Sequence, residues 1–298
     1  MNAIETSGLT KYYGRSRGIV DVDLTVAEGD FFGFIGPNGA GKSTTIRTLL
    51  GLIAPTAGQA ALFGRDVTKH KTELLARVGY LPSETMFYSG MTVKEILAFS
   101  AGLRRRDCTA EAKRLCERLE LDGSQRVERL SLGNRKKVGI VCALQHEPDL
   151  YILDEPTSGL DPLMQRAFYD LLEERNRAGA TVFLSSHILS DVGRYCRTAA
   201  VIREGRILAC DRVEALGHTG TKRVTLRGVT PELSVPGAVN VTREEGTLTF
   251  LYDGAPAELV RVLSGLEFED FTVTDPDLEE IFMHYYGKEG EEYDPVLA

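Results

Sequence analysis

Between the apolar run 31–35 and a segment of helical composition lies the stretch Gly36-Pro37-Asn38-Gly39-Ala40-Gly41-Lys42-Ser43-Thr44. It matches the phosphate-binding pattern G-x-x-x-x-G-K-[ST] at every fixed position. Glycines let backbone N–H groups approach a triphosphate closely, and the following helix presents its positive end to the anion. In such a loop Lys42 reaches the β- and γ-phosphates, Ser43 ligates Mg²⁺ and Thr44 bonds on the α-phosphate side. The alternative, an incidental glycine-rich turn, is disfavoured by the strand before it and the helix after it.

Composition excludes several classes of protein. The 298 residues are 43% hydrophobic and 26% charged, which is ordinary for a soluble globular chain. A net charge of −8 gives no basic surface for nucleic acid. We expect no membrane span, because no apolar run approaches about 20 residues, and no signal peptide. The 5 cysteines form no C-x-x-C pair, which is typical of unpaired thiols in a reduced cytosolic protein.

A second apolar run, 150–153, ends in Asp154 and Glu155. Such a run suits a parallel strand buried on both faces, and ligands bind at the carboxyl end of such strands. In phosphoryl-transfer sites the first acid holds the Mg²⁺ shell and the second polarises a water molecule. The alternative is an ordinary loop that contains two acids. The run 181–184 predicts a neighbouring strand, so we expect His187 at the same edge of the sheet.

Three other positions are candidates for nucleotide contact or for helix caps. Tyr13, in preference to Tyr12, is placed to stack on a purine, although packing within a strand is the alternative. Ser131 is expected to cap a helix, and with Gly133 it forms either a second anion site or only a cap and a surface turn. Asp161, which is followed by proline, predicts the start of another helix.

The remaining patterns predict the organisation of the chain. Alternating residues from 3 to 32 indicate an antiparallel flap on the nucleotide-binding core. A capping box, Thr92-x-x-Glu95, opens a helical region. We predict a core domain at 1–216, with a helical subdomain at about 84–147, and a small α+β domain at 217–298. The smaller domain is expected to hold strands near 222–228, 247–252 and 269–273, a helix at 256–264, a capped helix from Asp275 to Gly287, and a flexible acidic tail after Lys288.

This order of elements resembles the nucleotide-binding subunit of an ATP-binding-cassette (ABC) transporter over residues 3–216. The resemblance implies an α/β phosphate-loop NTPase core with a mixed sheet, an antiparallel flap and a helical subdomain, and it implies ATP and Mg²⁺ as cofactors. The matching positions are Tyr13 for the aromatic loop, Gly36 to Thr44 for Walker A, Leu130 to Asn134 for the signature, Leu150 to Glu155 for Walker B, Ser158 to Asp161 for the D-loop and His187 for the switch histidine.

The resemblance also implies a dimer, formed with a second copy or a related ATPase subunit. Two such subunits close head-to-tail, so Ser131 and Gly133 would contact the γ-phosphate of the partner's ATP. Asp161, in the D-loop, is counted with the nucleotide site. The signature departs from the family at Leu132 and Asn134, but the positions expected to touch phosphate are intact.

By the same resemblance Glu155 is the general base for the attacking water, His187 contacts the γ-phosphate, and Asp154 holds Mg²⁺ through water. One departure is sharper. The loop after Leu81-Pro82 normally presents a glutamine to Mg²⁺ and the water, and here the residue is Ser83. A serine oxygen cannot reach as far, so we expect altered coupling between hydrolysis and transport rather than lost hydrolysis.

The sequence thus predicts an ATP-hydrolysing subunit that drives export through a separate integral-membrane permease. The export direction comes from the C-terminal domain, which resembles the tail of ATPases that serve ABC-2-type exporters. We expect the chain at the cytoplasmic face of the membrane, with the helical region 84–130 docking on the permease. The alternatives are a soluble ABC-type ATPase not linked to transport, and a nucleotide-binding switch. A basic surface, tandem cassettes or a coiled-coil insertion would favour the soluble ATPase, and the sequence has none of these.

Overall fold

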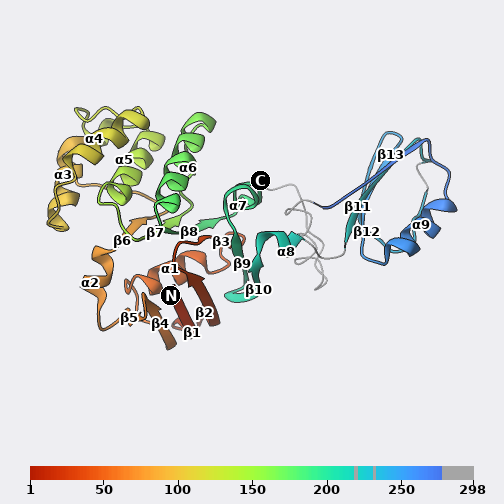
Figure 1. Cartoon of the computed structure of the whole chain (residues 1–298), viewed down its shortest axis with the longest axis horizontal. Helices are drawn as coiled ribbons and strands as arrows, with labels where there is room; N and C mark the ends of the chain where they lie inside the picture. The colour runs from red at the N-terminus through yellow and green to blue at the C-terminus, as the bar shows by residue number, and fades with distance from the viewer. Residues whose placement is uncertain (218–220, 231–232, 277–298) are drawn as a thin grey trace. The chain divides into compact units, whose positions relative to one another are not determined.

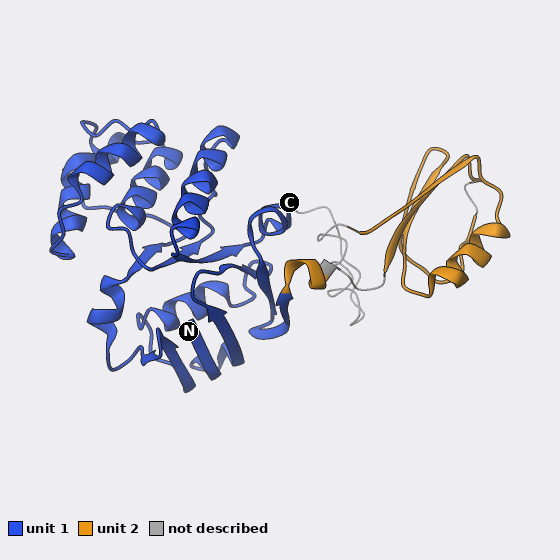
Figure 2. Cartoon of the chain, viewed as in Figure 1, with its two compact units in different colours: residues 1–211 blue, residues 212–298 orange. Residues whose placement is uncertain are grey.

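The computed structural model describes residues 1–217, 221–230 and 233–276. Contacts between residues divide the chain into two compact units, residues 1–211 and residues 212–298 (Figure 2). The helix predicted between Asp275 and Gly287 lies almost wholly outside the described residues, and the acidic tail after Lys288 lies entirely outside them.

An antiparallel sheet forms one layer of the larger unit (Figure 1). In its strand β2 (Ser16–Ala27) the buried residues Val22, Leu24 and Val26 alternate with exposed ones, as expected where one face of a sheet packs on the core. The flap predicted for residues 3–32 is confirmed. In the order β2-β1-β4-β5, the strands are β2 (Ser16–Ala27), β1 (Asn2–Tyr13), β4 (Ala57–Leu62) and β5 (Arg65–Asp66).

A second, mostly parallel sheet carries the predicted site residues at the ends of its strands. Every residue of its strands β3, β7 and β8 is buried, because both faces of the sheet are covered. In the order β10-β9-β3-β8-β7-β6, the strands are β10 (Arg206–Arg212), β9 (Thr198–Arg203), β3 (Phe31–Ile35), β8 (Thr181–Ser186), β7 (Leu150–Asp154) and β6 (Val78–Leu81).

Helix α1 (Lys42–Leu49) contacts both sheets and joins them into one core. Ile46 and Leu49 of this helix are fully buried in a cluster with residues of β1, β2, β3, β7 and β8. The other helices that flank the sheets are α2 (Lys71–Ala76), α6 (Pro162–Arg177) and α7 (Leu189–Tyr195).

The helical region lies between β6 and β7 in the sequence. The predicted capping box is confirmed: Thr92 accepts a hydrogen bond from the backbone of Glu95, whose side chain accepts one from the backbone of Thr92. The helix that this box opens ends at Leu103, because Arg105 adopts a left-handed conformation with φ 52°. The elements are α3 (Val93–Leu103), α4 (Thr109–Arg118), the 3₁₀ turn η1 (Val127–Arg129) and α5 (Leu132–Leu144).

The smaller unit contains an antiparallel sheet and a helix that covers one of its faces. Phe250 and Leu226 of the sheet pack with Leu259 and Leu263 of the helix. The helix predicted at 256–264 is confirmed, while strand β12 was not predicted because most of its side chains are exposed. In the order β12-β13-β11-β14, the strands are β12 (Ala238–Glu244), β13 (Thr247–Tyr252), β11 (Lys222–Arg227) and β14 (Asp270–Thr274), and the helices are α8 (Val213–Gly217) and α9 (Pro256–Ser264).

His146, which follows α5, is a buried titratable group in this core. Its Nε2 lies 3.2 Å from the backbone oxygen of Val78 and donates to it. Burial lowers the pKa of His146 from 6.5 to about 4, and the nearby cation of Arg104 acts in the same direction. The imidazole is therefore neutral in the folded protein at pH values where an exposed histidine is charged.

This burial predicts an acid-sensitive fold. Below pH 6.5 the unfolded chain takes up a proton at His146 while the folded protein does not until about pH 4. The free energy of unfolding should therefore fall by about 1–2 kcal/mol between pH 6.5 and pH 5 on account of this group. In denaturant unfolding, the free energy of unfolding of His146→Gln should depend less steeply on pH over that range than that of the unmodified protein. If the surface variant His70→Gln flattened the curve equally, the buried imidazole would not be the cause.

Candidate functional site

Residues 36–41 form a loop between β3 and α1, as the sequence predicts. Gly39 and Gly41 adopt positive φ values of 80° and 112°, which favour glycine. At Gly36 the reason for glycine is a close approach, because a Cβ there would lie 2.3 Å from the backbone oxygen of Ile202 in β9. The loop is thus held tightly against the parallel sheet, and the first N–H groups of α1 face the space beyond it.

Lys42 is the buried cation of the site, with only 6% of its side chain exposed. Its Nζ donates to the backbone oxygen of Gly36 at 2.5 Å and to that of Pro37 at 3.2 Å. It also lies 3.2 Å from Oε1 of Glu155. A buried ammonium group needs such partners, because burial without them is very costly.

Asp154, at the end of β7, accepts two hydroxyl hydrogen bonds. Ser43 Oγ donates to one of its carboxylate oxygens at 2.7 Å, and Ser185 Oγ of β8 donates to the other at 3.0 Å. The sequence did not identify Ser185 as a site residue. Ser185 is recognised from the pairing of β7 with β8, because their parallel register places it directly beside Asp154.

Glu155 follows immediately and turns its side chain toward Lys42. Its backbone has a φ of 48°, a left-handed conformation that is uncommon for a residue other than glycine. His187, after β8, lies with Nδ1 2.6 Å from Oε2 of Glu155. The structure therefore brings together the two residues that the sequence placed at one edge of the sheet.

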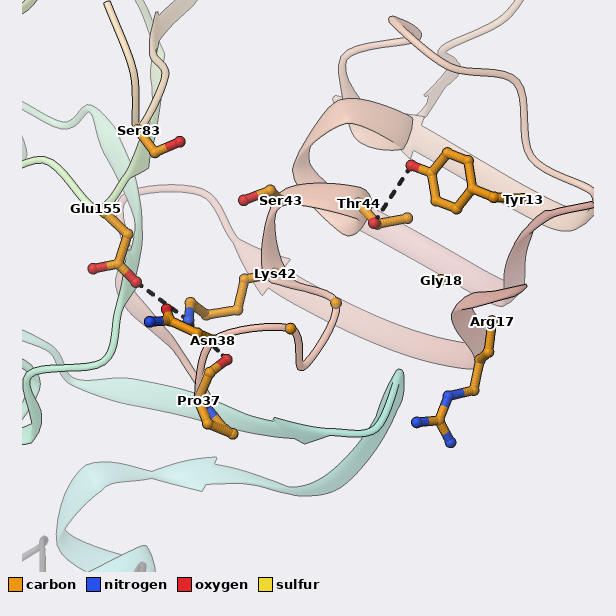
Figure 3. Close-up of a pocket in the computed structure, with 12 residues that line it drawn as sticks. Tyr13, Arg17, Gly18, Pro37, Asn38, Lys42, Ser43, Thr44, Ser83 and Glu155 are labelled. Atoms are coloured by element: carbon orange, nitrogen blue, oxygen red, sulfur yellow. Dashed lines mark hydrogen bonds and ion pairs between the residues drawn. The ribbon is translucent and has the colours of Figure 1, made fainter. Parts of the chain in front are cut away.

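Lys42, Ser43 and Glu155 line a cavity of about 290 Å³, whereas Asp154 and His187 contact these residues from outside its lining (Figure 3). Ser83 and Glu155 lie on one side of it, Tyr13 and Arg17 lie on the other, and Lys42 projects between them (Figure 3). The Tyr13 hydroxyl lies 3.5 Å from Oγ1 of Thr44, at the start of α1. The other residues that line the cavity are Gly18, Pro37, Asn38, Gly39 and Gly41.

The residues predicted from the signature and the D-loop do not line this cavity. Ser131 caps α5 as expected, since its Oγ accepts a hydrogen bond from Asn134 at 3.2 Å. Asp161 caps α6 in the same way, by accepting from Met164 at 3.0 Å. A Cβ on Gly133 would lie 2.7 Å from the backbone oxygen of Gly159, so the signature and the D-loop pack closely in one chain.

Lys136 links α5 to the loop that carries Ser83. It is 3% exposed, and its Nζ donates to the backbone oxygens of Ser83 at 2.9 Å and of Pro82 at 3.2 Å. Burial lowers the pKa of Lys136 to about 8, while the carboxylates of Asp154 and Glu155 act in the opposite direction. This role was not predicted, because a run of basic residues on a helix normally indicates a solvated face.

Comparison with known proteins agrees with this geometry. A family model described as ABC transporter matches residues 19–158. The bacitracin transport ATP-binding protein BcrA of Bacillus licheniformis is 41% identical over 212 residues, which cover 69% of this chain and 68% of that protein. The Nod factor export ATP-binding protein I of Cupriavidus pinatubonensis is 32% identical over 304 residues, 96% of this chain and 91% of that protein. This chain belongs to the ABC transporter ATP-binding proteins.

Solved structures show the same fold. One described as the ATP-binding subunit of an ABC transporter superposes with a TM-score of 0.68 at 33% identity, over 72% of this chain and 91% of that chain. A dimeric bacterial ABC transporter cassette shares the fold with a TM-score of 0.61 at 24% identity, over 70% of this chain and 98% of that chain. This ABC protein is accordingly an ATP-binding subunit of the class that hydrolyses ATP. Among the helices of residues 1–217, 221–230 and 233–276, none combines the length and the apolar character of a membrane span.

The close contact at Gly36 predicts that this position does not tolerate a side chain, whereas Gly39 of the same loop has room for one. Gly36→Ala should lower the free energy of unfolding by at least about 3 kcal/mol, because the methyl group meets a backbone oxygen that moves only if β9 moves. Gly39→Ala is the matched control. Its Cβ meets no atom within 4 Å, so only left-handed strain of about 1 kcal/mol remains. Denaturant unfolding measures both, and equal losses would contradict the contact as the cause.

Proposed function

We propose that this subunit binds ATP with Mg²⁺ in the cavity beside the phosphate loop, and that ATP hydrolysis drives export through a separate membrane subunit. The observation that carries the proposal is the convergence of Lys42, Asp154 and Glu155 at the carboxyl edge of one parallel sheet. In this arrangement Walker A residues 36–44 cradle the phosphates, and Tyr13 lies where it can stack on the base.

The donor set fits Mg²⁺. Ser43 and Asp154 offer a hydroxyl and a carboxylate within hydrogen-bond distance of each other, and Mg²⁺ prefers such oxygen donors. Few protein ligands are required, because Mg²⁺ keeps several waters and binds the phosphates of its nucleotide. These two residues would hold the ion, which would neutralise charge on the phosphates. Ser185 fixes the orientation of Asp154 from the neighbouring strand.

Glu155 is the proposed general base. Its carboxylate lies beside Lys42 at the end of β7, where it can accept a proton from a water that attacks the γ-phosphate. His187 contacts Glu155 and is proposed to orient it. Its proposed contact with the γ-phosphate rests on the family resemblance. Lys42 is proposed to exchange its contact with Glu155 for phosphate oxygens when the nucleotide enters.

A second ABC subunit is proposed to complete the site. Ser131 and Gly133 lie outside the cavity of their own chain, as expected if they contact the ATP of a partner. Leu132, between them, is 67% exposed, and Leu163 near the D-loop is also exposed. Apolar side chains on such a face favour its burial against another subunit. Asp161 then lies at the same interface.

A membrane permease is the second proposed partner. Met86, Tyr88, Phe99 and Leu103 are exposed on the helical region, and the rings of Tyr88 and Phe99 pack edge to face at 5.7 Å. We propose these residues as the docking surface for the permease, and we propose that the docked subunit lies at the cytoplasmic face of the membrane. Export is favoured because the matched relatives are named for bacitracin transport and Nod factor export. We assign residues 1–216 to the ATPase domain and 217–298 to an accessory domain.

Replacing the general base should separate binding from hydrolysis. Glu155→Gln is expected to lower the rate of phosphate release by at least about 100-fold, because an amide cannot accept the proton. The affinity for a non-hydrolysable ATP analogue should be retained or rise modestly, since Glu155 is not a proposed phosphate ligand and its charge competes with phosphate for Lys42. The exposed Glu28→Gln is the control and should retain full activity. Normal turnover in Glu155→Gln would remove this residue from the mechanism.

Purification from native membranes tests the membrane partner. The tagged chain should retain a multi-pass membrane protein in stoichiometric amount, and Met86→Glu should release it, because a charge then enters an apolar contact. Leu208→Glu is the matched control, an exposed apolar residue on β10 outside the docking surface. If the unmodified chain brought only soluble partners, transport would be excluded and the soluble ABC-type ATPase would be favoured.

A further inference from the structure

Arg17 lines the nucleotide cavity, although no pattern in the sequence pointed to it. It lies at the start of β2, next to Gly18. A Cβ on Gly18 would lie 3.0 Å from the Tyr13 ring and 3.1 Å from the Thr44 methyl group. The glycine therefore lets the Tyr13 ring and the start of α1 pack directly on the strand. Arg17, one residue earlier, is left at the rim of the cavity on the Tyr13 side (Figure 3).

Glu204 holds Arg17 in place. Nη1 of Arg17 lies 2.9 Å from Oε2 of Glu204, and both side chains are largely exposed. Glu204 belongs to the turn between β9 and β10, and this turn is attached to the phosphate loop. Gly205 donates its N–H to the backbone oxygen of Ala40 at 2.8 Å and accepts a hydrogen bond from Val20 at 2.8 Å. The turn that carries Glu204 is thus attached by its backbone to the phosphate loop.

The charges of the cavity are unevenly distributed. Lys42 and Arg17 are the cationic side chains of its lining, and Glu155 is the anionic one. Lys42 lies deep in the cavity with three oxygen partners, whereas Arg17 lies at the rim with a solvent-exposed carboxylate. A nucleotide that extends from the phosphate loop toward Tyr13 passes this rim. Its phosphates carry more negative charge than Glu204 and match the planar donors of a guanidinium group.

We propose that Arg17 is a nucleotide-binding residue that exchanges Glu204 for phosphate oxygens when ATP binds. The inference rests on the proposed nucleotide site and adds a residue to it. In the free subunit Glu204 holds the guanidinium at the rim, and in the bound subunit the phosphate chain takes the place of the carboxylate. Glu204 is therefore a competitor of the nucleotide, so the two members of the ion pair affect affinity in opposite directions.

Equilibrium binding to the full-length chain tests this exchange, with a non-hydrolysable ATP analogue, ADP and adenosine as probes. Arg17→Ala should weaken the binding of the ATP analogue about threefold to tenfold. The range is modest because the guanidinium is half exposed and screened by water. Adenosine, which has no phosphate, should be unaffected. Glu204→Gln should tighten the binding of the analogue. This gain in affinity should disappear in the variant that carries both Arg17→Ala and Glu204→Gln. Arg15→Ala, an exposed arginine of the same hairpin, is the matched control and should bind like the unmodified chain.

Two outcomes would overturn the proposal. If Arg17→Ala and Glu204→Gln both weakened binding, the ion pair would only support the turn beneath the phosphate loop. If Glu204→Gln still tightened binding in the Arg17→Ala background, its carboxylate would act by general repulsion. Failure of the nucleotide site itself is a separate result, because the unmodified chain would then bind neither the analogue nor ADP.

Discussion

The register of the parallel sheet is the constraint on which the site depends. Ile35 of β3 pairs with Ser186 of β8, and Asp154 of β7 pairs with Ser185. The three strands therefore end at the same level, and the phosphate loop, Glu155 and His187 all leave from one edge. A shift of one residue would turn Asp154 to the other face of the sheet and break its contact with Ser43. Buried apolar side chains on both faces of β3, β7 and β8 fix this register.

Charge compensation follows from that geometry. The backbone oxygens of Gly36 and Pro37 surround Lys42 because the loop folds back over its own lysine. Glu155, which follows β7, supplies the negative charge that neutralises Lys42. These partners offset the cost of burying an ammonium group. Each of them carries less negative charge than a phosphate group. A triphosphate offers more charge in the same place, so the site is organised before its ligand arrives, which lowers the entropic cost of binding.

Much of this could be predicted because the signals were local. The phosphate loop, the capping box at Thr92 and the caps at Ser131 and Asp161 each depend on a few consecutive residues. The positions of the phosphate loop, Glu155 and His187 followed from the rule that parallel strands present their carboxyl ends together. Strand β12 was missed because its alternation is short, with Val239 and Val241 as its only large apolar residues, and both are exposed.

Arg17, Ser185 and Lys136 could not be predicted, because each acquires its role from a contact distant in sequence. Ser185 needs the register of β7 and β8, Lys136 needs α5 to pack beside the loop at Ser83, and Arg17 needs Glu204.

The meeting point of three glycines explains how distant segments share one site. A Cβ on Gly41 would lie 3.3 Å from Cα of Gly205, and one on Gly205 would lie 2.7 Å from the backbone oxygen of Gly18. The β9–β10 turn thus meets β2 through backbone atoms, and the phosphate loop meets both segments, with the Ile19 side chain 2.8 Å from the Cβ position of Gly41. Such a contact transmits small shifts, because packed backbone has little room to yield. The hydrogen bond from Gly205 to Ala40 holds the turn beside the phosphate loop, which is why the ion pair of Arg17 and Glu204 lies next to the nucleotide cavity.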